Sequence, residues 1–184
     1  WSPKLTNGEV QAYQFEVDYE MFSGSCVSVH TASDEEIANG LLSILAVEGP
    51  MLGHLLMSRY VKAGGDLKVT RQVKRKLNSV ISRLVSRKII SFDNPTNVAG
   101  NIGKTFHLPD QPKVIARTRG ERELADIPYR ELHAVMEHVG TQFGLDDSEV
   151  VMRETLKTFH LKRLTDKAKD ILDVPLQRLR EEAR

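Results

Sequence analysis

The sequence predicts a mainly α-helical protein with a small β component, built as tandem winged helix-turn-helix units, the first with a β-hairpin wing and the second without. Three observations support this prediction. Apolar residues recur at helical spacing in six segments, and two short β-type segments follow the third of them. In addition, a stretch of 51 residues matches a later stretch of the same chain without a gap. The 184 residues, 40% hydrophobic and 28% charged, suffice for one medium domain or two small ones.

A capping box begins the first helical segment. Ser33 and Glu36 stand three residues apart ahead of an apolar run, the spacing at which each side chain satisfies a backbone N–H of the other residue. They predict a helix over about 34–47. Gly49-Pro50 ends this helix, because proline lacks the backbone donor that a helix interior requires.

Two further helices and a hairpin complete the first copy. Apolar residues at helical spacing predict helices over about 51–63 and 70–88, separated by a tight turn at 64–66. Short β-type segments at 89–92 and 104–108 flank a loop rich in asparagine and glycine, and we expect them to pair. Three helices followed by a hairpin describe a winged helix-turn-helix.

The second copy is found by shifting the chain against itself by 95 positions. Residues 34–84 then match residues 129–179 without a gap. Gly49 meets Gly144, and apolar positions coincide along the helical segments, although few residues are identical. The shared glycine and the gapless alignment favour a repeated fold over chance similarity between two amphipathic stretches.

The helices of the second copy have their own start signals. Asp126 and Pro128 are predicted to begin the first helix, Asp146 with Glu149 to cap the second, and Thr165 to begin the third. The sequence ends in or just after the third helix, so we expect no wing in this copy. Because the chain starts at Trp1, we expect it to be part of a longer protein.

The remaining segments complete a four-part layout. Residues 13–19 alternate apolar and polar side chains, which is typical of a strand with one buried face. Because a lone strand is unstable, we expect it to pair with the wing hairpin or with parent-protein sequence. We therefore predict an N-terminal β arm and loop over 1–33, a winged helix-turn-helix over 34–112, a connector over 113–126 and a wingless unit over 127–184.

Charge is distributed very unevenly along the chain. Residues 59–88 carry ten lysines and arginines against a single acid, whereas residues 1–58 carry one lysine against eight acids, and the formal net charge is only +1. A basic cluster on a helix-turn-helix pattern favours duplex DNA as a partner. A solvated basic helix face without any ligand is the alternative interpretation.

The third helix of the first copy holds the candidate DNA contacts. A projection at 100° per residue places its apolar residues on one side and polar and basic residues on the other. Arginine reads guanine with two hydrogen bonds, asparagine or glutamine reads adenine, and serine or lysine holds phosphates. The predicted contacts are Lys68, Thr70, Arg71, Gln72, Lys74, Arg75, Asn78, Ser79 and Ser82.

The corresponding face of the second copy is acidic. It is predicted to expose Asp166, Asp170, Asp173, Gln177 and Glu181. Because carboxylates repel the phosphate backbone, we expect this copy to be a structural or protein-binding partner of the first. The loop between the two β-type segments has no base before Lys104, so we expect the hairpin to be structural rather than a minor-groove contact.

Catalysis is not expected. The chain has no G-x-x-x-x-G-K-[ST], H-E-x-x-H or G-x-S-x-G motif. Its six histidines are scattered, and the single cysteine, Cys26, excludes an internal disulfide and a cysteine-rich zinc site. We predict no cofactor, no metal and no small-molecule substrate. No apolar run approaches the roughly 18 residues of a membrane span, so we expect no membrane partner and a reducing, cytoplasmic setting.

Two short motifs carry a resemblance to a known family. Residues 127–132 (Ile-Pro-Tyr-Arg-Glu-Leu) fit an I-P-x-x-E-[IL] pattern, and residues 161–163 (Leu-Lys-Arg) fit G-[FL]-K-R with His160 in place of the glycine. Over about residues 34–180 the chain resembles the uncharacterised C-terminal domain of very large bacterial helicase-like proteins of superfamily one. The resemblance implies a non-catalytic appendage of an ATP-dependent DNA enzyme, with the parent's other domains as partners. It transfers no site residues.

Three functions follow from these observations. The first is a DNA-binding tandem module that positions a larger helicase or nuclease on duplex DNA. The second is a free-standing transcription regulator, which needs a symmetric dimer to read two half-sites. The third is a protein-interaction module that uses the winged-helix scaffold without nucleic acid.

Overall fold

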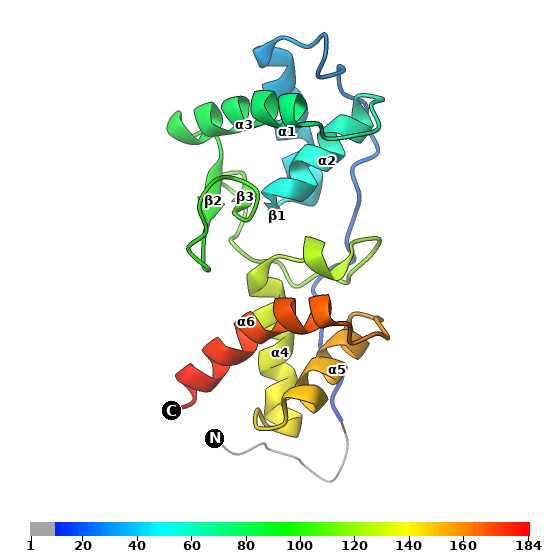
Figure 1. Ribbon diagram of the computed structural model, residues 1–184, viewed down its shortest axis with the longest axis vertical. Coiled ribbons are helices and arrows are strands. Elements are labelled where there is room, and N and C mark those ends of the chain that lie inside the picture. Colours follow the sequence, from blue (N-terminus) through cyan, green and yellow to red (C-terminus); the bar gives the residue numbers. More distant parts are fainter. Residues whose placement is uncertain (1–9) are drawn as a thin grey trace. The chain divides into compact units, whose positions relative to one another are not determined.

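The computed structural model describes residues 10–184, and contacts along the chain divide it into two compact units (Figure 1). The sheet unit comprises Glu20–Val114, and the helical unit comprises residues 10–19 together with Ile115–Arg184. Within the described residues the chain forms six α-helices, one 3-10 helix and one small antiparallel sheet. The prediction of a mainly α-helical protein with a small β component is thereby confirmed.

The sheet unit contains three helices and three short strands. In chain order they are α1 (Asp34–Glu48), β1 (Met51–Leu52), α2 (Gly53–Ala63), α3 (Arg71–Ser86), β2 (Ser91–Asp93) and β3 (Thr105–His107). The predicted capping box is present at α1, where the Glu36 N–H donates to the Ser33 hydroxyl over 3.1 Å and the Ser33 N–H donates to the Glu36 carboxylate over 3.0 Å. Local signals therefore place this helix start correctly.

The sheet has the order β1-β3-β2, and β3 is antiparallel to both neighbours. Phe106 of β3 lies opposite Met51 on one side and Phe92 on the other. The prediction that the second helix begins at about residue 51 is wrong. Because the backbone of Met51–Leu52 pairs with β3, the helix starts only at Gly53.

The loop between β2 and β3 returns to the start of α2. The Gly53 N–H donates to the Lys104 carbonyl oxygen over 2.9 Å, and the His54 N–H donates to the Ile102 carbonyl oxygen over 3.0 Å. A methyl group on Gly53 would lie 1.8 Å from the carbonyl oxygen of Asn101. The close approach of the loop to α2 therefore requires a glycine at this position.

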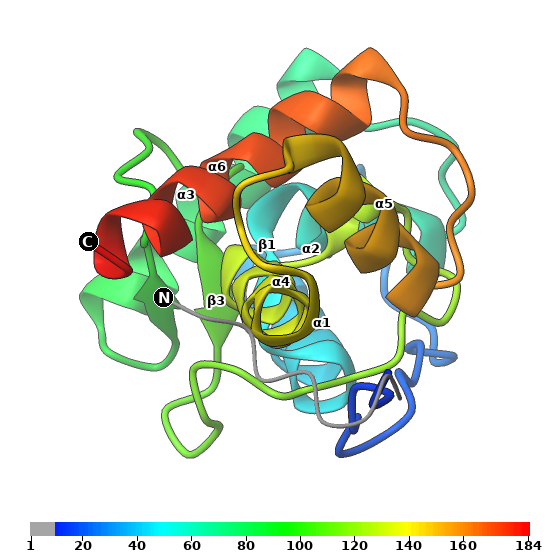
Figure 2. The same cartoon turned by 90° about the horizontal axis from the view of Figure 1, so that it is seen from below.

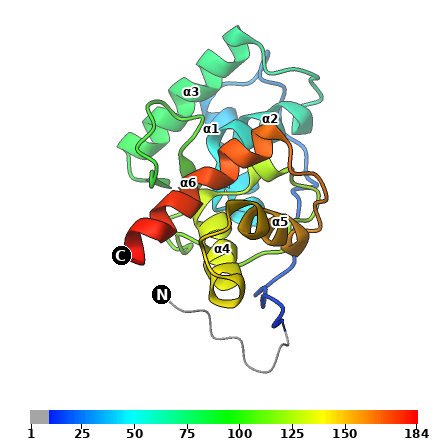
Figure 3. The same ribbon diagram turned by 60° about the horizontal axis from the view of Figure 1, so that its bottom comes forward.

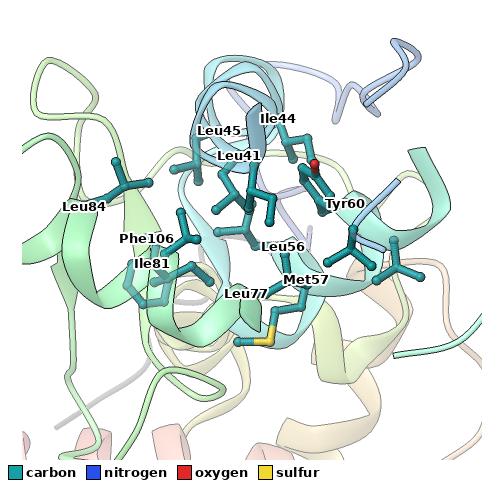
Figure 4. Packing of buried hydrophobic residues seen from close by; sticks show 14 of the residues in the cluster. Leu41, Ile44, Leu45, Leu56, Met57, Tyr60, Leu77, Ile81, Leu84 and Phe106 are labelled. Carbon is teal, nitrogen blue, oxygen red and sulfur yellow. The ribbon is translucent and has the colours of Figure 1, made fainter. Parts of the chain in front are cut away.

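The core of the sheet unit lies where its three helices meet the sheet (Figure 4). Side chains from α1, α2 and α3 point toward one another, and Phe106 contributes from β3. The fully buried members labelled in the figure include Leu41, Ile44, Leu56, Tyr60, Leu77 and Ile81. This core fixes one side of α3 against α1 and leaves the other side outside it.

The helical unit contains η1 (Leu124–Asp126), α4 (Tyr129–Phe143), α5 (Ser148–Thr158) and α6 (Asp166–Glu182). α4 contacts both α5 and α6, and Figures 2 and 3 show the three helices from two further directions. The predicted cap Thr165 begins α6, with its hydroxyl accepting from the Ala168 N–H over 3.1 Å. α5 is capped by Asp147, one residue after the predicted position.

The helices of the two units start at a constant interval. α4, α5 and α6 begin 95 residues after α1, α2 and α3, respectively. Buried positions coincide at the same interval, for example Leu77 with Leu172 and Ile81 with Leu176. The turn before the third helix also agrees, because Gly65 (φ 82°) and His160 (φ 58°) both adopt the left-handed conformation.

The predicted strand over 13–19 is not a regular strand. Residues 10–19 form a single parallel bridge, Val17 with Arg117, rather than pairing with the hairpin. Tyr13 and Phe15 pack against the core of the helical unit. The alternation therefore marks a segment with one apolar face, but that face packs against helices and not within a sheet.

Candidate nucleic-acid interface

α3 is an amphipathic helix with one face in the core of the sheet unit. Thr70 caps its N-terminus, with its hydroxyl accepting from the Val73 N–H over 3.2 Å. Its buried side chains recur at intervals of three and four residues, namely Val73, Leu77, Val80, Ile81 and Leu84. Of the polar residues selected from the sequence, five lie between these positions and four precede Val73, and none belongs to the core.

Most of the predicted contact residues are accessible to a ligand. The exposed ones are Lys68, Thr70, Arg71, Gln72, Arg75, Ser79 and Ser82. Lys74 and Asn78 are half-buried. The exposed arginines belong to the N-terminal half of α3, which is the half that contacts base edges in a helix-turn-helix.

Four cations at this end of α3 are not neutralised inside the protein. Among residues 10–184, no side-chain hydrogen bond or ion pair engages Lys68, Arg71, Lys74 or Arg75. The first turn of α3 also contains no acid, so the partial positive charge of the helix N-terminus adds to their field. This surface, Lys68 to Arg75, is called the basic face below.

Asn101, in the loop between β2 and β3, binds the middle of α3. Its side-chain amide nitrogen donates to Asn78 Oδ1 and to Ser82 Oγ, both over 3.1 Å. These two predicted contact residues are therefore held by the loop, and the surface open to a ligand is centred on the first two turns of α3. The sequence indicated only that the loop is rich in asparagine, which does not reveal the contact.

Three of the ten bases in residues 59–88 are used inside the sheet unit. Arg59 donates to the fully buried carboxylate of Glu48 over 2.8 Å. Lys76 donates to two backbone carbonyls before α1, each over 2.9 Å, and Arg83 pairs with Asp34 over 3.0 Å. The charge available to a ligand is therefore smaller than the composition of the segment indicates.

The third helix of the helical unit presents a different surface. The five polar residues predicted to face outward on α6 are exposed, namely Asp166, Asp170, Asp173, Gln177 and Glu181. Asp166 and Asp170 stand 95 residues after Arg71 and Arg75. The two helices therefore carry opposite charge at equivalent positions in their units.

Other kinds of site find little support in the part of the chain that the structure describes. Between residues 10 and 184, no group of three or more histidine, cysteine, aspartate or glutamate side chains is placed so that it could hold a metal ion. No helix in this range is both long enough and apolar enough to span a membrane. Cys26 is half-buried, and burial raises the pKa of its thiol above the usual value. A raised pKa reduces the share of reactive thiolate at neutral pH.

Comparisons of the chain with protein-family models, curated proteins and solved structures give no significant match. The resemblance to the helicase-associated family stays a prediction.

Proposed function

We propose that this chain is a non-catalytic DNA-binding module with two winged-helix-type units and that it is an appendage of a larger DNA-processing protein of the helicase or nuclease kind. The observation that carries the proposal is the basic face, where Lys68, Arg71, Lys74 and Arg75 lack internal partners among the described residues. In this proposal the sheet unit binds the duplex and the helical unit does not.

The order of elements supports the winged-helix part of the proposal. β1 lies between α1 and α2 in the chain and pairs with β3 of the hairpin that follows α3. This pairing anchors the hairpin beside the helix-turn-helix, as a wing requires. The constant 95-residue interval between helix starts supports a second unit with the same helical fold.

The chemistry of the basic face suits a duplex. Arg71 and Arg75 are four residues apart, so they lie about 6 Å apart along the helix axis and on the same side of α3. That spacing lets both arginines reach adjacent base pairs in a major groove, where a guanidinium can donate two hydrogen bonds to guanine. Lys68 and Lys74 flank them and suit phosphate contacts.

The acidic face of α6 supports an asymmetric module. Asp166, Asp170 and Asp173 are exposed, and carboxylates on a helix that entered a groove would repel phosphates. The helical unit is therefore assigned to contacts with protein, such as the other domains of a parent. Cofactors have no part in this function.

Fluorescence anisotropy with a labelled duplex of about 20 base pairs tests the proposal on the whole chain. Four unpaired cations predict a log–log dependence of affinity on salt with a slope of about −3 to −4. Arg75→Glu should weaken binding at least tenfold and make the slope shallower by about one. Lys169→Glu, which reverses an exposed charge on α6, serves as the matched control and should leave affinity within about twofold.

Four results would contradict the proposal. One is a variant pair, Arg75→Glu and Lys169→Glu, with equal affinity. Another is tighter binding of single-stranded DNA or RNA of the same length than of the duplex. A stable symmetric dimer in sedimentation, combined with duplex binding, would favour the transcription regulator, whereas absent DNA binding at low salt would favour a protein-interaction module.

A further inference from the structure

The helical unit contains an open groove of about 380 Å³ beside the start of α6. η1 forms one wall, and the turn between α5 and α6 together with the first turns of α6 forms the other. The floor is apolar and is lined by Leu124, Leu156, Leu161, Ala168 and Ile171. Of these, Leu161 and Ile171 are only partly buried, so apolar surface is left uncovered in the groove.

The equivalent place in the sheet unit is closed by polar contacts. Lys76 of α3 donates to the backbone carbonyl oxygens of Val29 and Ala32, each over 2.9 Å. Asp66, in the turn before α3, accepts from the Ser28 hydroxyl over 2.8 Å. These contacts join the segment before α1 to the third helix and its preceding turn.

Apolar residues replace both closing side chains in the helical unit. The positions 95 residues after Asp66 and Lys76 are Leu161 and Ile171. Neither side chain can donate or accept a hydrogen bond, so the contacts that close the sheet unit cannot form here. The two units therefore differ at this place, although their helices start at a constant interval.

The rim of the groove is positively charged. Lys162, Arg163 and Lys167 line it and are exposed, and within residues 10–184 no side-chain hydrogen bond or ion pair engages them. The lining contains one acid, Glu123, which caps η1 by accepting from the Asp126 N–H. The rim therefore carries an excess of positive charge around an apolar floor.

We propose that this groove docks a short, acidic amphipathic helix of a partner protein. Its volume is near the lower end of ligand pockets, roughly 300–1,000 Å³, and suits a few aliphatic side chains on one helix face. Glutamates or aspartates beside them would meet the three rim cations. The apolar floor has no groups that read a nucleobase, which favours a peptide over nucleic acid at this place. The inference does not rest on DNA binding by α3.

The test uses the whole chain and a fluorescein-labelled helical peptide of about 14 residues, with leucines one turn apart on a glutamate-rich background. Anisotropy should show saturable binding with a Kd of about 10–100 μM. Ile171→Lys introduces the side chain found at the equivalent position of the sheet unit, Lys76, and should weaken binding at least tenfold. The peptide with serine in place of leucine should not bind.

Exposed rim substitutions keep the test independent of folding. Lys162→Glu combined with Arg163→Glu should weaken binding at least tenfold and remove most of its salt dependence, whereas the matched Lys169→Glu, outside the groove lining, should change it less than twofold. No saturable binding up to about 500 μM, or equal loss with Lys169→Glu, would overturn the proposal. So would a duplex that displaces the peptide from the Arg75→Glu variant, because the rim would then bind nucleic acid.

Discussion

Glu131→Gln should strongly destabilise the helical unit. The Glu131 carboxylate is 3% exposed and accepts from Arg117 Nη2 over 2.8 Å. It also accepts from Arg122 Nη1 over 3.1 Å at each of its oxygens. Arg122 is 1% exposed and its guanidinium lies 4.1 Å from the ring centroid of Tyr19. One buried anion thus holds two buried cations.

The magnitude follows from what the substitution leaves behind. Removing one partner of a buried ion pair costs about 3–5 kcal/mol, because the remaining charge stays desolvated. Here two guanidinium groups would lose their common anion, so we expect about 4–5 kcal/mol. The pKa of Arg122 agrees with a destabilising effect. Burial lowers this pKa because it opposes the charged guanidinium, whereas the Glu131 carboxylate stabilises that charged form.

Urea denaturation followed by far-ultraviolet circular dichroism measures the loss, and hydrogen exchange assigns it to residues 115–184. Arg153→Ala is the control, because the exposed Arg153–Glu149 pair is also 2.8 Å long but should contribute less than about 1 kcal/mol. A Glu131→Gln loss below about 1 kcal/mol would refute the reasoning. It would mean that the two arginines remain solvated or find other anions.

Two further predictions concern single residues in the two units. Burial, with smaller effects of Cys26 and Glu36, raises the pKa of Tyr60 from 10.0 to about 12. The folded sheet unit therefore favours the protonated phenol, and its free energy of unfolding should fall by up to about 2–3 kcal/mol as the pH rises from 10 toward 12. Urea titrations at pH 9–12 should show a flatter pH dependence for Tyr60→Phe. His160→Gly should raise the free energy of unfolding, measured by thermal denaturation, by about 0.5–1 kcal/mol. The reason is that the exposed His160 has a φ of 58°, a conformation that favours glycine. An unchanged or lower free energy of unfolding would contradict this prediction.

Local signals predicted the helices well. Ser33 and Thr165 cap helices at the expected residues, since a cap depends on side chains within three positions of it. The apolar stripe of α3 also identified its buried face, because one helix has one period. The exposure of the two arginines of the basic face, Arg71 and Arg75, followed from the same projection.

Contacts between distant residues could not be predicted in this way. β1 is two residues long and fits a helical pattern equally well, so only its pairing with Phe106 reveals it. The tether from Asn101 to Asn78 joins residues 23 positions apart. Likewise, Glu131 belongs to the motif that suggested a family resemblance, yet its partners Arg117 and Arg122 lie in the segment expected to be a connector.

The third helices of the two units differ in charge and polarity outside their cores, and this has a functional consequence. Core positions keep apolar residues, as with Leu77 and Leu172, because both units must bury the same helix faces. Equivalent positions outside the core diverge in charge and polarity: the exposed Arg71 corresponds to the exposed Asp166, and the half-buried Lys76 corresponds to the half-buried Ile171. Substitutions of this kind cost little stability when they are exposed. Two units whose helices start at a constant interval can therefore carry a cationic helix in one and an apolar groove in the other. The two proposed binding activities are therefore separable by mutation, each on its own third helix.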